Sequence, residues 1–401
     1  MATRLRRLSA AALAVTVALT VVPASSLQPD RPWPGASWPE ATPASQGLSS
    51  AALDAIDRDA RSGAYGNLDR LVVIRNGYMV VNHRYGRDYR AISRGMSGPL
   101  GCGEGCTDAA KMHEFNYFHP NWHPYYHGRD VHTLQSVTKS VAATLIGIAL
   151  GRGEIETLDQ PFLEHFAGRE LSKADPGLRQ ATIDDLLTMR SGIEWHESDR
   201  PLDETNTTYQ LEYSRDWIAF TLSQPMDAAP GTKWAYNSGG SMLLSGIIRN
   251  ATGRFIDEYA REHLFTPIGI KEFHWKKTPT GHPDTEGGLY LSAEDLARIG
   301  YLYLRDGLWN GRRVLPEGWV GRATARHVRA VAPGWDYGYQ WWIMSRDGVD
   351  IWAGRGFGGQ FLIVVPSRDI VAVANAWNVF GTKARNVLPP LVDALLKDDQ
   401  P

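Results

Sequence analysis

Apolar and polar residues follow a strand-like pattern near both ends of the chain. Two apolar runs, 71–74 and 78–83, flank the turn Arg75-Asn76-Gly77, and this arrangement predicts a β-hairpin. The last hundred residues return to the strand pattern, with a hairpin turn expected at 366–369. Strands are expected there over residues 338–344, 351–353, 360–365 and 370–374.

Helical spacing dominates between these two parts. Residues 136–150 are apolar on most sides, so the sequence predicts a buried helix that ends at Gly151 and Gly153. Residues 155–290 are mostly helical in pattern, with breaks at proline and glycine. Further helices are expected over residues 49–60, 242–248, 292–304 and 388–396.

The order of these elements predicts the fold class. Strands come from both ends of the chain and helices lie between them. We therefore expect an α/β (α+β) fold, in which an antiparallel sheet built from both termini is flanked by helices and a mostly helical subdomain is inserted. The sheet is expected from about 47–135 and 291–396, the helical region from about 136–290, and the whole of 47–396 as one catalytic domain.

The first 46 residues differ from the rest in composition. Arg4, Arg6 and Arg7 precede the uncharged apolar run 11–22, and small residues follow it. This pattern predicts a signal peptide over 1–24 and a secreted, periplasmic or extracellular protein. Residues 25–46 are rich in Pro, Ser and Ala and predict a linker. No second apolar stretch is long enough to span a membrane, so no span is expected in the mature chain.

Charge narrows the kinds of partner. The 401 residues carry a formal net charge of -2, and no long run has one sign. A chain without a basic field is not expected to bind nucleic acid. A small-molecule or peptide substrate is the expected partner, and the oligomeric state stays open.

A long excursion over residues 86–131 is rich in Gly, His, Pro and aromatic residues. Its only cysteines, Cys102 and Cys106, favour a local disulfide in an exported chain. Five histidines near it (His113, His119, His123, His127, His132) keep a zinc site open as an alternative, although their spacing matches no known geometry. Trp122, Tyr125 and Tyr126 are expected to form a wall over the site that follows.

Ser136 and Lys139 open the predicted buried helix in the pattern S-x-x-K. Positions three apart share a helix face, so Lys139 should lie one turn from the Ser136 hydroxyl. A serine needs a base to become a nucleophile, and burial lowers the pKa of a lysine, so neutral Lys139 is expected to be that base. The alternative is a chance match, because S-x-x-K is short.

Two further segments carry candidate chemistry. Tyr236 and Ser238 lie in W-A-Y-N-S-G-G before an apolar helix, and Tyr236 could relay the proton to the leaving group. The alternative is an aromatic loop with a serine cap. Gly354, Arg355, Gly356 and Phe357 enter a late strand, where glycines let a substrate lie against the strand edge and a main-chain N–H supplies an oxyanion donor. A simple bulge is the alternative there.

Together these motifs resemble the penicillin-binding, class C β-lactamase-like serine hydrolase family over roughly residues 45–395. The resemblance implies that Ser136 is acylated, that Tyr236 and Lys139 act as general base and acid, and that the N–H groups of Ser136 and Phe357 form the oxyanion hole, with no cofactor. It also rests on the stretches His132-Thr-Leu-Gln-Ser-Val-Thr-Lys-Ser, Asp185-Leu-Leu-Thr-Met-Arg-Ser-Gly, Gly287-Gly-Leu-Tyr-Leu-Ser-Ala-Glu-Asp-Leu-Ala-Arg and Tyr337-Gly-Tyr-Gln-Trp-Trp.

Two departures from the penicillin-recognising members favour another branch of the family. Ser238 stands where those members have Asn, and Gly354-Arg355-Gly356 stands where they have Lys-Thr-Gly. Arg355 could replace the missing lysine, but a side chain one place along a strand is expected to point to the opposite face. The sequence therefore resembles the esterase and 6-aminohexanoate-oligomer hydrolase branch.

The resulting hypothesis is a secreted serine hydrolase that cleaves an amide or ester through an acyl-Ser136 intermediate. Three alternatives remain at this stage. They are a D,D-peptidase or weak β-lactamase acting on cell-wall peptides, a non-catalytic sensor that keeps the fold, and a metal-dependent hydrolase at the histidine-rich segment.

Overall fold

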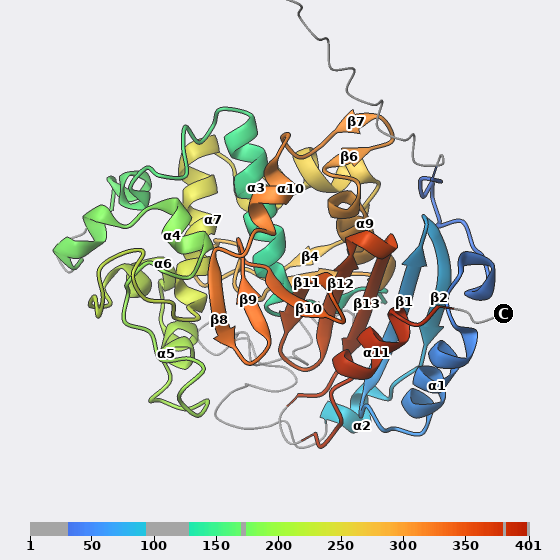
Figure 1. Ribbon diagram of the computed structural model, residues 1–401. Coiled ribbons are helices and arrows are strands. Elements are labelled where there is room, and N and C mark those ends of the chain that lie inside the picture. The colour runs from blue at the N-terminus through green and yellow to red at the C-terminus, as the bar shows by residue number, and fades with distance from the viewer. Residues whose placement is uncertain (1–30, 94–127, 170–173, 380–381, 399–401) are drawn as a thin grey trace, which may run out of the picture. The chain divides into compact units, whose positions relative to one another are not determined.

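The computed structural model describes residues 31–93, 128–169, 174–379 and 382–398 (Figure 1). The chain from Pro32 onward forms one compact unit. The expected signal peptide, the candidate pair Cys102 and Cys106, and the aromatic residues expected to cover the site all lie outside the described residues.

An eight-stranded antiparallel sheet lies at the centre of this unit, in the order β2-β1-β13-β12-β11-β10-β9-β8. Its strands are β1 (Leu68–Arg75), β2 (Tyr78–Arg84), β8 (Val328–Ala332), β9 (Trp335–Tyr337), β10 (Trp342–Arg346), β11 (Val349–Gly356), β12 (Gln360–Val365) and β13 (Ile370–Ala376). Two smaller sheets are also present. One has three strands in the order β3-β5-β4, with β3 (His132–Thr133), β4 (His274–Trp275) and β5 (Leu289–Leu291). The other pairs β6 (Leu308–Trp309) with β7 (Arg312–Arg313).

The sheet is built from both ends of the chain, which confirms the expected fold class. β1 pairs with β13, so Leu71 lies opposite Ala374 across the ladder. β1 continues into β2 through Asn76 and Gly77, whose φ angles of 53° and 83° are the left-handed values that a tight Asn-Gly hairpin turn requires. The predicted hairpin is therefore present where the sequence places it.

The helices complete the unit. They are α1 (Ser50–Arg61), α2 (Tyr89–Ser93), α3 (Val137–Gly151), α4 (Ile183–Leu187), α5 (Thr207–Tyr213), α6 (Trp217–Leu222), α7 (Ser238–Thr252), α8 (Ile256–Ala260), α9 (Ala293–Leu304), α10 (Trp319–Ala323) and α11 (Leu388–Leu395). Most helices of the stretch between β3 and β5 gather beside the sheet, around α3 and α7 (Figure 1).

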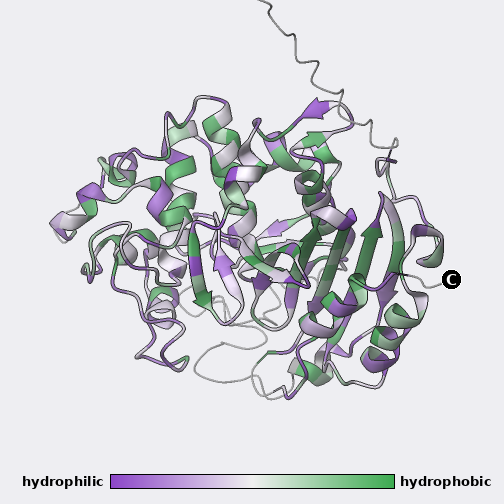
Figure 2. Cartoon of the chain, viewed as in Figure 1, coloured by the Kyte–Doolittle hydropathy of each residue, from purple (hydrophilic) through white to green (hydrophobic). Residues whose placement is uncertain are grey.

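Two hydrophobic cores lie on the two faces of the sheet. Along β13, Ile370, Ala372 and Ala374 join the core under α1 and α11, whereas Val371 and Val373 join the core around α3 and α9. Successive side chains of a strand point to opposite faces, so a strand buried on both sides is apolar along its length. Figure 2 shows this as continuous green along the central strands.

Two stretches differ from the sequence prediction. Residues 32–46, expected within a linker, are packed against the unit: Trp38 is buried, lies 5.3 Å from the ring of Tyr301 and donates to the Glu294 carbonyl. Composition misleads here because a few large aromatic side chains anchor an otherwise polar stretch. The expected strand 338–344 starts too early, since residues 338–341 form the connection between β9 and β10 and the strand begins only at Trp342.

Among the described residues, no helix has both the length and the apolar character that crossing a membrane requires.

Candidate active site

Ser136 lies at the start of α3, directly after β3 and a strained residue. Gln135 has φ 48°, a left-handed conformation that is uncommon for a residue with a side chain and that is found at functional sites. Ser136 occupies the N-cap position, yet its side chain makes no capping hydrogen bond. The hydroxyl is therefore left to the groups of the site, in a stretch whose neighbouring residues are buried.

Lys139 lies one helical turn from Ser136, as the S-x-x-K spacing predicts. Its Nζ donates to the Ser136 Oγ over 3.0 Å and to the Glu286 carbonyl over 2.7 Å. The Glu286 carboxylate lies 4.0 Å from the same nitrogen. Lys139 is 1% exposed, so these contacts hold its ammonium group in one place with its charge compensated.

Tyr236 reaches the same point from the loop before α7. The Asn237 side chain accepts from the Gly240 N–H over 2.7 Å and so caps α7, which fixes the loop that carries Tyr236. The ring of Tyr236 lies 5.3 Å from Lys139 Nζ and stacks on Trp342 with the ring centroids 5.7 Å apart. The structure thus brings Ser136, Lys139 and Tyr236 together.

The electrostatics of this group correct one expectation. Burial lowers the pKa of Lys139, but the negative charges of Tyr236 in its phenolate form, Glu286 and Glu197 raise it by more, so its pKa lies above the ordinary value. Burial also raises the pKa of Tyr236, and the Lys139 charge lowers it only in part. The resting pair is therefore an ammonium and a neutral phenol, and the expectation of a neutral Lys139 is wrong because it considered burial alone.

Glu197 is a site residue that the sequence prediction missed. Its carboxylate accepts from the Ser238 N–H over 2.9 Å, the Ser238 hydroxyl over 2.8 Å and the Trp195 indole over 3.0 Å. The hydroxyl of Ser238, which was expected to meet substrate, is thus engaged with Glu197. Glu197 lies a few residues after the family stretch that begins at Asp185, but no motif in the sequence around Glu197 indicates a role in the site.

The end of β11 offers a strand edge beside Ser136. β10 begins at Trp342, which pairs with Ala353, so Gly354, Arg355 and Gly356 extend past the start of β10. A Cβ on Gly356 would lie 2.4 Å from the Leu134 carbonyl, which means that only glycine lets the strand approach the segment before Ser136 so closely. These residues line the cavity described below, with the exception of Gly354, which faces Val137 and Ser140 of α3.

Arg355 lies where the sequence prediction did not expect it. The side chain does point away from the α3 side, on which Gly354 lies, as strand alternation requires. However, that side lines the cavity at this end of β11. The guanidinium carbon lies 4.6 Å from the ring centre of Trp335 and 4.7 Å from that of Trp342. The expectation that Arg355 points away from the site is therefore wrong.

Phe357 follows at the rim. Its side chain is 48% exposed and lines the same cavity. Its place at the end of β11, near Ser136, agrees with the oxyanion role that the family resemblance implies for its N–H. That role stays a prediction.

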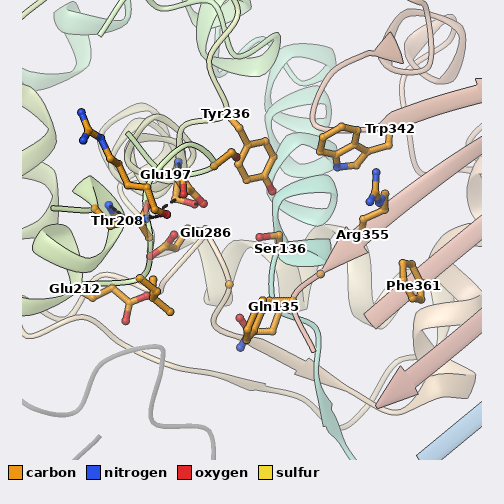
Figure 3. Close-up of a pocket in the computed structure, with 18 residues that line it drawn as sticks. Gln135, Ser136, Glu197, Thr208, Glu212, Tyr236, Glu286, Trp342, Arg355 and Phe361 are labelled. Carbon is orange, nitrogen blue, oxygen red and sulfur yellow. Dashed lines mark hydrogen bonds between the residues drawn. The ribbon is translucent and has the colours of Figure 1, made fainter. Parts of the chain in front are cut away.

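These residues enclose a cavity of about 430 Å³ (Figure 3). Ser136 and Tyr236 lie in its middle. Glu197, Glu286 and Glu212 lie on one side of them, and Trp342 and Arg355 lie on the other (Figure 3). The lining therefore carries charges of both signs, with three glutamates and two arginines: Arg200, from the same segment as Glu197, and Arg355, on the side of the sheet.

Gln340 supports the site from behind. It is buried, has φ 58°, and its carbonyl accepts from the Ser140 hydroxyl over 2.6 Å. Its amide accepts from Ser241 over 2.9 Å and donates to the Leu186 carbonyl over 2.9 Å. One residue therefore ties together α3, through its main-chain carbonyl, and α7 and the end of α4, through its side chain. Its only sequence signal is its place in the quoted motif that begins at Tyr337.

The histidine-rich segment offers no metal site within the described ranges, where no group of three or more His, Cys, Asp or Glu is placed to hold an ion. Four of its five histidines lie outside those ranges. His132 is buried, and its ring lies 4.0 Å from that of Trp377.

Comparison with known proteins relates this arrangement to characterised enzymes. The chain is 27% identical over 265 residues to 6-aminohexanoate-dimer hydrolase from Paenarthrobacter ureafaciens. That match covers 61% of the chain and 65% of the relative, which is just under two thirds of the relative's length. It is 29% identical over 276 residues to penicillin-binding protein 4 from Amycolatopsis lactamdurans, covering 59% of the chain and 69% of that protein.

Solved structures share the fold. A putative 6-aminohexanoate-dimer hydrolase from Bacillus anthracis has a TM-score of 0.64 at 20% identity, covering 89% of the chain and 85% of that protein. A family VIII carboxylesterase has a TM-score of 0.61 at 14% identity, covering 89% and 98%. The family model described as Beta-lactamase matches residues 57–396, which include Ser136, Lys139 and Tyr236. The chain therefore belongs to the beta-lactamase family.

Proposed function

We propose that this enzyme hydrolyses an ester or amide through an acyl intermediate on Ser136. One observation supports this above all: the Lys139 Nζ lies 3.0 Å from the Ser136 Oγ beside a cavity of about 430 Å³, which is large enough for a small substrate. A hydroxyl in contact with a group that can exchange its proton is the arrangement of an activated nucleophile. Relatives and structural neighbours named hydrolase, carboxylesterase and amidohydrolase support the same reaction class.

Acylation would proceed in one addition and one elimination. The Ser136 Oγ forms a bond to the substrate carbonyl carbon as its proton passes to the Lys139–Tyr236 pair, and the carbonyl oxygen becomes an oxyanion. The N–H groups of Ser136 and Phe357 stabilise that oxyanion. When the carbonyl re-forms, the bond to the leaving alcohol or amine breaks, and Tyr236 returns the proton to the leaving atom. Water then repeats these steps on the acyl-Ser136 and releases the acid.

The raised pKa values of Lys139 and Tyr236 set the pH dependence of this mechanism. The resting pair holds both protons, and the form that accepts the Ser136 proton has lost one of them. Because rising pH removes that proton, kcat/KM should rise towards alkaline pH. The apparent pKa of this rising limb of the pH profile belongs to the coupled Lys139–Tyr236 pair and to neither residue alone.

Intact-mass analysis tests the proposal. Wild type, Ser136→Ala and the exposed-serine control Ser367→Ala are each treated with an activated ester and, separately, with a penicillin. We expect a transient ester adduct in wild type and Ser367→Ala, its absence in Ser136→Ala, and hydrolysis reduced by about 10⁴-fold or more in that variant.

The alternatives give different results in the same experiment. A long-lived penicillin adduct on Ser136 would indicate that the substrate is a cell-wall peptide and not the proposed ester or amide. An ester adduct that persists in Ser136→Ala, or no adduct with either reagent, would contradict the proposed reaction.

A further inference from the structure

The Ser238 hydroxyl meets the catalytic cavity with its proton directed away from it. Its Oγ lies 2.8 Å from one oxygen of the Glu197 carboxylate, and a carboxylate only accepts, so the hydroxyl is the donor of this hydrogen bond. Both residues line the cavity around Ser136 (Figure 3). The Ser238 oxygen therefore turns lone pairs, and no proton, towards a substrate.

The other Glu197 oxygen keeps the carboxylate in this role. It accepts from the Ser238 N–H over 2.9 Å and from the Trp195 indole over 3.0 Å, so two donors converge on it. The Glu197 carbonyl also accepts from the Asn206 side chain over 2.9 Å. A Cβ on Gly239 would lie 2.4 Å from the Trp195 ring, so the indole is packed tightly against the start of α7. The Glu197–Ser238 pair is thus preorganised.

A fixed acceptor in the cavity distinguishes substrates by their donors. Ser238 is 1% exposed, and a buried acceptor that is left without a donor is costly. Arg200 also lines the cavity, but it is exposed, and none of the hydrogen bonds found among the described residues joins it to Ser238. The N–H of a secondary amide is a suitable donor, whereas an ester or a tertiary amide has none. A site built around such a hydrogen bond disfavours substrates that lack the donor.

From these observations we propose that Glu197 is a positioning residue that makes the Ser238 hydroxyl a hydrogen-bond acceptor, and that the substrate class is compounds with a secondary amide at or beside the cleaved bond. This inference rests on the proposed function, in which Ser136 is acylated. It goes further by naming the group that the substrate presents and the residue that selects it.

The experiment compares substrate pairs that differ in one N–H group. 4-Nitroacetanilide and its N-methyl derivative differ at the leaving atom. The 4-nitrophenyl esters of N-acetylglycine and of 4-oxopentanoic acid differ in the acyl group, where the second has CH₂ in place of N–H. For at least one pair, the ratio of kcat/KM in wild type should favour the N–H member beyond the ratio of the two rates of alkaline hydrolysis. Both members of a pair undergo the same reaction, so this ratio is insensitive to the protonation of the Lys139–Tyr236 pair.

Two variants test the roles of the two residues. Ser238→Ala removes the acceptor and should lower the ratio by about 5-fold, as expected for one hydrogen bond. In Glu197→Gln, the two converging donors require the amide oxygen, so the amide NH₂ group donates to the Ser238 Oγ. The Ser238 proton then turns towards the cavity and faces the substrate N–H. The ratio should therefore fall further in Glu197→Gln than in Ser238→Ala.

Asp199→Asn is the matched control. It removes a carboxylate from the same segment, where Asp199 accepts from His196, and it should keep the ratio of wild type.

Three outcomes would overturn the inference. One is an unchanged ratio in Ser238→Ala for both pairs. Another is an equal loss on both members of each pair in Glu197→Gln, which would limit Glu197 to supporting the fold. The last is a fall of the same size in Asp199→Asn, which would assign the effect to the charge of the segment. If no substrate acylates Ser136 in wild type, the proposed function itself fails, which is a distinguishable result.

Discussion

Two buried bases flank Ser136 and have opposite pKa shifts. His132, four residues before it, has its pKa lowered to about 4, because burial outweighs the charge of Asp69 and a hydrogen bond to the Thr133 carbonyl. Lys139, three residues after it, has its pKa raised, because the charges of Tyr236, Glu286 and Glu197 outweigh burial. Both side chains are almost fully buried.

This comparison shows that burial alone does not decide the protonation of a base. His132 packs against Trp377, and its burial outweighs the nearby negative charges of Asp69 and Asp130, while Arg70 further opposes a positive charge on the ring. Lys139 lies among groups that are, or can become, anions. The first base is therefore neutral and structural, and the second is a charged part of the catalytic group.

The largest expected effect comes from removing the charged base. Lys139→Met should lower kcat/KM by about 10³-fold or more, because the Ser136 proton then has no neighbouring pair to receive it. His132→Asn, which keeps a donor towards the Thr133 carbonyl, should retain activity. Initial rates on one activated ester decide this. Comparable losses in both variants would break the distinction between the two bases.

A smaller effect should appear in the stability of the fold at acid pH. The pKa of His132 is about 4 when folded and near 6.5 when unfolded, so only the unfolded chain binds the proton between these values. The stability that comes from keeping His132 neutral is thus fully present above pH 6.5. As pH falls towards 4, the free energy of unfolding decreases by about 3 kcal/mol.

Urea denaturation of wild type and His132→Asn at pH 7, 5.5 and 4.5 measures this contribution. The difference in unfolding free energy between the two proteins should change with pH in the stated direction. A constant difference would mean that His132 is not held neutral by burial.

The smallest expected effect concerns the anions around Lys139. Glu286→Gln removes a carboxylate 4.0 Å from the ammonium, so the pKa of the Lys139–Tyr236 pair should fall. The rising limb of kcat/KM should then shift to lower pH by about one unit. Glu197→Gln should shift it in the same direction, since Glu197 raises the pKa of both residues.

The pH profile of kcat/KM for each variant, measured beside Glu286→Asp as a charge-keeping control, tests this. A limb that moves to higher pH, or that moves equally in the control, would contradict the account of Lys139.

Local patterns predicted much of the fold because their causes are local. Asn76 and Gly77 specify the β1–β2 turn, and a serine before an amphipathic run specifies the start of α1 and of α9. The same patterns missed β8 and β9 and placed the start of β10 four residues too early. β8 is the edge strand of the sheet and β9 is its neighbour, and their partly exposed residues show little alternation.

The site divides in the same way. Ser136 and Lys139 are three residues apart on one helix, so their contact follows from spacing alone. Glu286 lies 147 residues beyond Lys139, and Gln340 lies 200 residues beyond Ser140. Contacts of this kind depend on tertiary packing, which cannot be inferred from a short stretch of sequence. The protonation of Lys139 was mispredicted for the same reason, since its anionic neighbours come from distant segments.

The pairing of β1 with β13 also has a consequence for biosynthesis. Leu68 lies opposite Ala376, so the edge of β1 that does not pair with β2 has no partner until almost the whole chain has left the ribosome. At typical elongation rates of roughly 5–20 residues per second, the β1–β2 hairpin waits for tens of seconds with an open edge. During that time the open edge is a template on which another chain can pair, so aggregation of the nascent chain would begin there.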